Sequence, residues 1–147
     1  MAHVRKEIRD NLTTALTGLA STGDKVYQSR VYPLAANKLP GLLIYSKSES
    51  TQYQVMGLPR LQLRTITLSV EIYVKGTSSY DNDIDQICLE VEEALYENRT
   101  LGGNAKDCKV VSVEIDFGGD GDQPVGRATL TVEVQYQVRE NDPDIAL

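Results

Sequence analysis

The chain has 147 residues, of which 41% are hydrophobic and 24% are charged, proportions typical of one soluble globular domain. Fifteen Lys and Arg against 21 Asp and Glu give a net charge of −6, which argues against broad nucleic-acid binding, because such binders carry a basic excess. The charge is uneven: residues 1–75 hold ten basic and five acidic residues (+5), and residues 76–147 hold five and sixteen (−11). A monomer can carry this difference without consequence, whereas a self-assembling ring could use it to attract neighbouring copies.

The N-terminus and the cysteines indicate the compartment. The segment MAHVRKEIRDNL lacks the apolar run of a signal peptide, and no stretch approaches the roughly 18 apolar residues of a membrane span. Cys88 and Cys108 do not have CxxC spacing, and Cys88 falls on the apolar face of a predicted helix. We therefore expect free thiols, a cytoplasmic location in the cell that makes the protein, and no membrane contact.

The first half of the chain begins with an amphipathic helix. Apolar residues recur at helical spacing over 3–19. Residues 25–32 predict a short strand that Pro33 ends, and residues 42–50 predict a second strand. The polar stretch 51–61 then forms a loop or the far end of a long hairpin.

The second half alternates between strand and helix patterns. Residues 62–76 predict a strand with one buried face and one face that is wet or meets a partner. We assign the threonines of this strand to the second, wet or partner-facing side, together with Arg64, Glu71, Tyr73 and Lys75. Residues 80–97 predict a second amphipathic helix. Strands over 109–117 and 127–138, joined by the Gly-rich turn 118–126, predict an antiparallel hairpin.

The order helix, strand, strand, strand, helix, strand, strand predicts an α+β fold. Two amphipathic helices would pack on one face of a mainly antiparallel or mixed sheet. We expect a single domain over residues 1–138 and a flexible C-terminal tail over residues 139–147.

The chain offers no catalytic constellation. His3 is the sole histidine and is expected to be an exposed residue at a helix start, which excludes His-dependent triads and multi-His metal sites. The acidic run 81–85 has the count of a calcium loop, but Gln86 stands where that loop needs glycine, and the helical period continues through it. We interpret it as a helix N-terminus, where the dipole favours carboxylates.

The acidic segment 116–122 predicts a hairpin turn. It lacks the lysine and following helix of a phosphate loop. Weak divalent-cation binding, or contact with a basic patch on another subunit, stays open for this turn. We expect no enzyme, metal or cofactor, and leave an unrecognised kind of enzyme as a remote alternative.

Several segments in order carry a family resemblance. The helix RKEIRDNLTTALTGL leads into VYQSRVYP, then LPGLLIY with Glu49 after it. The alternating strand, the acidic helix entered at 81–85 and a closing Thr-x-x-Val-x-Tyr-x-Val over 131–138 follow. In this order and spacing the chain resembles the tail terminator proteins of long-tailed bacteriophages, the lambda-like minor tail protein U group.

The resemblance implies a structural role. Such proteins form a hexameric ring on the end of the tail tube, stop its polymerisation and provide the surface that the head joins. The implied partners are further copies of the chain, the major tail tube protein and a head-side neck protein; DNA passes through without specific binding. The implied location is the head-proximal end of the virion tail, and the host cytoplasm during assembly.

Within this interpretation charged residues have candidate roles. A lumen lined by carboxylates would not hold DNA, because phosphate contacts come from Lys and Arg. The candidates for an acidic lumen or inter-subunit face are Asp81, Asp83, Asp85, Glu90, Glu92, Glu93, Asp120 and Asp122. The candidates for a complementary basic face are Arg5, Arg9, Arg30, Arg64 and Lys75. An ordinary solvated helix face explains the carboxylates equally well.

Two alternative functions stay open. The first is another head–tail connector or neck protein, which the sequence hardly separates from a terminator. The second, of a different class, is a small-ligand or divalent-cation binding module that uses the acidic turn.

Overall fold

The computed structural model describes residues 3–28, 40–75, 80–118 and 125–147. The elements in chain order are α1 (Val4–Leu16), β1 (Val26–Tyr27), β2 (Gly41–Tyr53), β3 (Leu61–Lys75), α2 (Tyr80–Glu97), β4 (Asp107–Gly118) and β5 (Val125–Arg139). The predicted α+β class and the predicted order of elements are confirmed.

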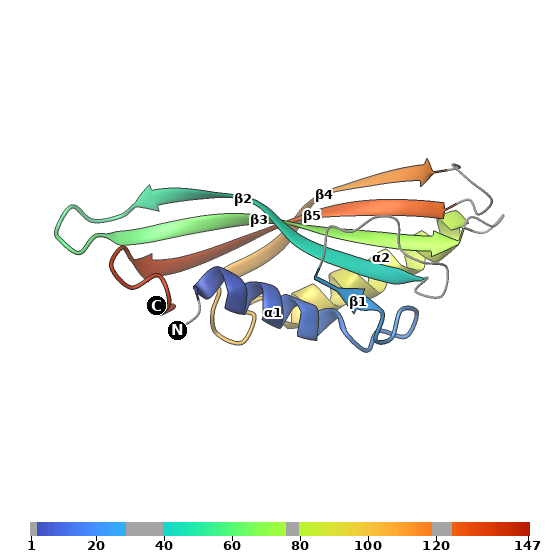
Figure 1. Cartoon of the computed structure of the whole chain (residues 1–147), viewed down its shortest axis with the longest axis horizontal. Coiled ribbons are helices and arrows are strands. Elements are labelled where there is room, and N and C mark those ends of the chain that lie inside the picture. The colour runs from blue at the N-terminus through green and yellow to red at the C-terminus, as the bar shows by residue number, and fades with distance from the viewer. Residues whose placement is uncertain (1–2, 29–39, 76–79, 119–124) are drawn as a thin grey trace.

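The strands form one five-stranded sheet in the order β1-β2-β3-β5-β4. β1 runs parallel to β2, and the other neighbouring pairs are antiparallel. Both helices cover the same face of this sheet (Figure 1). The arrangement is the mixed sheet with helices on one face that the sequence predicts.

The core lies between that face and the two helices. Along β3 and β5 the register places apolar residues opposite each other, as in the pairs Val70 with Leu130 and Ile66 with Val134, all fully buried. From the helix side, α1 buries one stripe of residues spaced four apart. Burial of these matched stripes is the main stabilising contribution, since it removes apolar surface from water.

One residue of β3 lies on the opposite face from the predicted one. Arg64 pairs in register with Tyr136 and shares the helix-covered face with Ile66, because side chains two residues apart point the same way. On the other face, Glu71 and Tyr73 are buried, and Tyr73 packs with Leu43 in a small second cluster. The prediction of a largely wet face is therefore wrong for this end of β3.

Several element boundaries differ from the predicted ones. α1 ends at Leu16, because Gly18 turns the chain with a φ of 90°. β1 spans only Val26–Tyr27, and residues 29–32 of the predicted strand lie outside the described residues. The stretch 51–61 is the far end of a long β2–β3 hairpin, which extends beyond the helices (Figure 1).

The C-terminal segment returns along the sheet to the N-terminus. The Glu140 N–H donates to the Arg60 carbonyl at 3.0 Å, and the Leu147 N–H donates to the Gln137 carbonyl at 3.0 Å. The Val4 N–H, at the start of α1, donates to the Pro143 carbonyl at 3.0 Å. These bonds hold the two termini close together beside the start of α1 (Figure 1). The flexibility of residues 139–147 stays a prediction.

Candidate functional site

The described residues contain no group of three or more His, Cys, Asp or Glu side chains placed to hold a metal ion. Both cysteines are free thiols, and burial raises the pKa of Cys88 to about 11, with the charges of Glu92 and Asp85 adding to the effect. A thiol held in its protonated form is a poor nucleophile.

The acidic residues at 81–85 form the start of α2, as predicted. Asp81 and Asp83 lie in the first turn of the helix, where the dipole stabilises them. The helix carries seven carboxylates and no Lys or Arg. All of the seven except Glu90 are exposed, and no ion pair among the described residues involves any of them. α2 therefore presents uncompensated negative charge to its surroundings.

Glu90 has a structural role in this arrangement. It accepts hydrogen bonds from the Ser21 N–H at 2.9 Å and from the Ser21 hydroxyl at 2.5 Å, which fix the turn after α1 to α2. Burial by itself would raise the pKa of Glu90, but these bonds and one from Gln86 outweigh it and the pKa is lowered. Its carboxylate is thus directed toward the turn after α1, on one side of α2.

The other predicted charged residues are spread over the molecule. Arg9 donates to Gln28 at 3.0 Å and to Ser46 at 3.2 Å, while Arg5 and Arg64 both reach Glu49. Outside the described part of the chain lie Arg30, the side chain of Lys75, and Asp120 and Asp122 of the predicted turn. The structure thus brings Arg5 and Arg64 together. Because both side chains already bind Glu49, they are less available to bind another molecule.

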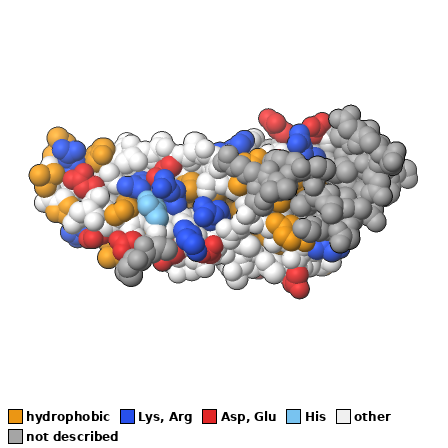
Figure 2. Space-filling model, viewed as in Figure 1, with side chains coloured by type: hydrophobic (Ala, Val, Ile, Leu, Met, Phe, Trp, Pro, Cys, Tyr) orange, Lys and Arg blue, Asp and Glu red, His pale blue; other side chains and the backbone are white. Residues whose placement is uncertain are grey.

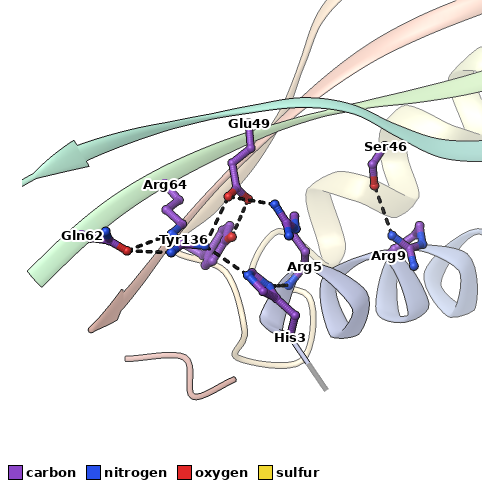
Figure 3. Close-up of polar contacts among 8 residues, drawn as sticks. All are labelled: His3, Arg5, Arg9, Ser46, Glu49, Gln62, Arg64 and Tyr136. Atoms are coloured by element: carbon purple, nitrogen blue, oxygen red, sulfur yellow. Dashed lines mark hydrogen bonds and ion pairs between the residues drawn. The ribbon is translucent and has the colours of Figure 1, made fainter. Parts of the chain in front are cut away.

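Glu49 is the centre of a polar cluster between α1 and the sheet (Figure 3). Its Oε1 lies 3.2 Å from Arg5 and 3.3 Å from Arg64, and its Oε2 accepts from the Tyr136 hydroxyl at 2.5 Å. The Glu49 and Arg64 side chains are only 11% and 14% exposed. Burial and the bond to Glu49 raise the pKa of Tyr136, so it stays protonated and donates. The cluster fixes the N-terminal half of α1 to β2, β3 and β5.

His3 completes this cluster at the start of α1. Its Nδ1 accepts from the Arg5 N–H at 3.0 Å, so the side chain caps the helix, and its Nε2 lies 3.1 Å from Arg64. Burial, then the charges of Arg5 and Arg64, lower the pKa of His3, which favours the neutral ring that a capping acceptor requires. The predicted place at a helix start is confirmed, but the ring is half-buried rather than exposed.

Exposed apolar side chains gather at the tip of the β2–β3 hairpin. Figure 2 shows them at the same end of the molecule as the hairpin in Figure 1. We call Tyr53, Val55, Met56 and Leu58 the hairpin tip; Met56 and Leu58 are 87% and 78% exposed. The sequence predicted a polar loop or hairpin end over this stretch. Its apolar residues are too few and too irregular to form a periodic pattern, so only the projecting hairpin reveals their exposure.

A second exposed apolar group lies on β4. We call Val111, Val113 and Ile115 the β4 patch; they are 46%, 41% and 53% exposed. The sequence predicted a strand over 109–117. In the structure every residue from Val111 to Asp116 is exposed.

Both outer edges of the sheet carry a β-bulge. β4 pairs with β5 alone among the described strands, and its register shifts between Val110 and Ser112. Within the described residues β2 pairs with β1 at Leu42 and Leu43, and its register shifts between Ser46 and Ser48 around Lys47. Bulges and edge lysines hinder the addition of a further strand. The edges therefore favour contacts through side chains over extension of the sheet.

Among the described residues, no helix is both long and apolar enough to cross a membrane.

Comparison with known proteins gives little beyond this. No family model and no curated protein matches the chain. A solved chain described as "Virion of native gene transfer agent (GTA) particle" is similar at 10% identity, over 90% of this chain and 92% of that chain, with a TM-score of 0.36. A likeness this distant does not transfer a role to this chain.

Proposed function

We propose that this protein is a structural subunit of a phage tail. In this role it forms a ring, hexameric on the tail, that caps the tail tube, ends polymerisation of the tube protein and provides the surface for head joining. The resemblance of the sequence to tail terminator proteins suggests this role.

The observation that carries the proposal is that one subunit presents two unlike surfaces in different places. The segment 80–118, which forms α2 and β4, holds ten acidic and three basic residues, a net charge of −7. The hairpin segment 47–64 holds three basic residues and one acidic residue, a net charge of +2. Unlike, complementary surfaces are what a head-to-tail ring requires, since each copy then attracts the next.

The exposed carboxylates of α2 fit either position proposed for them. On a lumen they would repel the phosphates of passing DNA; between subunits they would attract basic groups. In both positions they are external to the subunit's own packing, in agreement with their exposure.

The proposal is tested by tube growth. Tail tube protein is polymerised with and without the purified chain, and tube lengths and ends are measured in electron micrographs. We expect shorter tubes with a ring density at one end, and no change with an unrelated acidic protein of similar size. Uncapped tubes that continue to lengthen in the presence of the chain would refute the role; a ring that binds only head-side components would indicate a neck protein instead.

A further inference from the structure

The hairpin tip and the β4 patch are exposed apolar surfaces that packing inside the subunit leaves uncovered. Monomeric proteins seldom expose grouped apolar side chains unless they meet a partner. Single exposed apolar residues need no explanation, but here four lie within six positions at a projecting tip and three within five positions on one strand. Each group is therefore a candidate contact surface.

Most of the β4 patch continues the core beyond the area that the helices cover. Val113 lies opposite Leu130 and Ile115 lies opposite Ala128, and both partners on β5 are fully buried. Val113 and Ile115 therefore share the helix-covered face of the sheet, although they are exposed. On α2, Glu90 is turned toward Ser21, and Asp85 and Glu92 lie roughly on the opposite side of the helix. An apolar surface is thus left open beside α2 at the β4 edge.

Charge distinguishes the surroundings of the two surfaces. Glu114 and Asp116 alternate with the patch residues on β4, Asp116 in an ion pair with Arg127 at 2.7 Å, and Asp85 and Glu92 of α2 are exposed. The hairpin that carries the tip has the opposite net charge. At the tip itself Arg60 stacks on Tyr53 at 5.3 Å, and the exposed Arg139 lies opposite Leu61. The apolar surfaces match in character, and their surroundings are electrostatically complementary.

The two surfaces cannot meet within one copy. Register through β5 places the patch beside residues 70–72 of β3, nine to eleven residues from the hairpin end at Leu61. At about 3.3 Å per residue the separation is roughly 30–36 Å. The hairpin tip has the apolar character and the charge that suit the β4 patch, and the β4 patch has those that suit the tip. Because the two cannot meet within one copy, a second copy of the chain is the partner that the structure supports.

We propose that the hairpin tip of one copy packs on the β4 patch of the next copy. The contact is head-to-tail, and it leaves a pair of copies with one unused patch on the first and one unused tip on the second, as ring growth requires. The bulges at Lys47 and Val111 make side-chain packing, not strand addition, the mode of contact. This inference rests on the proposed ring and names its interface.

Two charged variants test the interface in solution. Met56→Glu places a charge in the hairpin tip and leaves the β4 patch intact. Val113→Glu places a charge in the β4 patch and leaves the hairpin tip intact. Sedimentation of the wild type is expected to show oligomers larger than dimers, and each variant alone is expected to be monomeric. Mixed one to one, the variants have one intact tip and one intact patch between them, so we expect a heterodimer and nothing larger.

Thr14→Glu, an equal charge change at an exposed position of α1, is the matched control and should assemble as the wild type does. Circular dichroism checks that all variants are folded. If Met56→Glu or Val113→Glu does not fold, Leu58→Glu or Ile115→Glu, respectively, takes its place in the same experiment. A wild type that stays monomeric, variants that assemble normally, or a mixture without heterodimer would each overturn the interface.

Tube capping is measured separately. If Met56→Glu assembles but fails to cap tubes, the tip contacts the tube and not a second copy. If the wild type assembles but leaves tubes uncapped, the capping role is rejected and the interface is not.

Discussion

At the residue scale, Glu49 decides how α1 is attached to the sheet. One carboxylate receives two guanidinium groups and a phenol, so its charge is compensated although the side chain is nearly buried. Removing Glu49 leaves the three donors without their charged acceptor, which costs more than the cluster contributes in net stability.

We predict that Glu49→Gln lowers the free energy of unfolding by about 2–3 kcal/mol, because Arg64 and Tyr136 lose a charged acceptor where little water reaches them. Urea unfolding followed by circular dichroism measures the change. Asp10→Asn is the control: it removes the charge of an exposed ion pair with Lys6 and should cost about 0.5 kcal/mol or less. Equal effects of the two substitutions would show that the Glu49 cluster is no more than a surface ion pair.

At the element scale, α2 has an end that its own charges destabilise. Its last turn contains no basic residue, and Glu97 lies there four residues after Glu93. Negative charge at a helix C-terminus opposes the dipole, and like charges four residues apart repel. A helix selected for stability alone would carry a lysine at this end, so the charge pattern is more readily explained by an external role for the acidic face.

We predict that Glu97→Lys raises the free energy of unfolding by about 0.5–1 kcal/mol, since it reverses both unfavourable interactions. Thermal unfolding is the measurement. Glu92→Lys makes the same charge change away from the helix end, where positions 88 and 96 carry no charge, and should give a smaller gain. A gain of equal size from both would assign the effect to the overall acidity of α2.

At the scale of the whole molecule, the uneven charge along the chain becomes a difference between surfaces. The acidic excess is concentrated on α2 and β4, whereas two arginines of the basic half are partly occupied by Glu49. Attraction between copies would therefore come chiefly from the acidic surface and the basic hairpin, with apolar contact supplying the rest.

We predict that raising NaCl from about 0.05 M to about 0.5 M weakens self-association roughly three- to tenfold, because salt screens exposed charges. Sedimentation equilibrium at several concentrations measures the change. The unfolding midpoint of the monomeric Met56→Glu variant over the same salt range controls for effects on folding. Oligomers that do not respond to salt would mean that apolar contacts alone hold the copies together.

The sequence by itself determined the type and order of the elements. Apolar periodicity is a local property, so the stripe of α1, the alternation of β3 and the helical period through 80–97 each predict their element without tertiary information. The acidic face of α2 is equally local, because its seven carboxylates all belong to one helix.

Only the tertiary structure decided which of these residues are available to a partner. Arg5 and Arg64 meet Glu49 because strand register and the position of α1 bring together residues up to 59 positions apart. Val113 and Ile115 alternate as core residues do, yet they are exposed because the helices do not cover that part of the sheet. Burial and pairing depend on how far one element extends over another, which is a long-range property that periodicity does not contain.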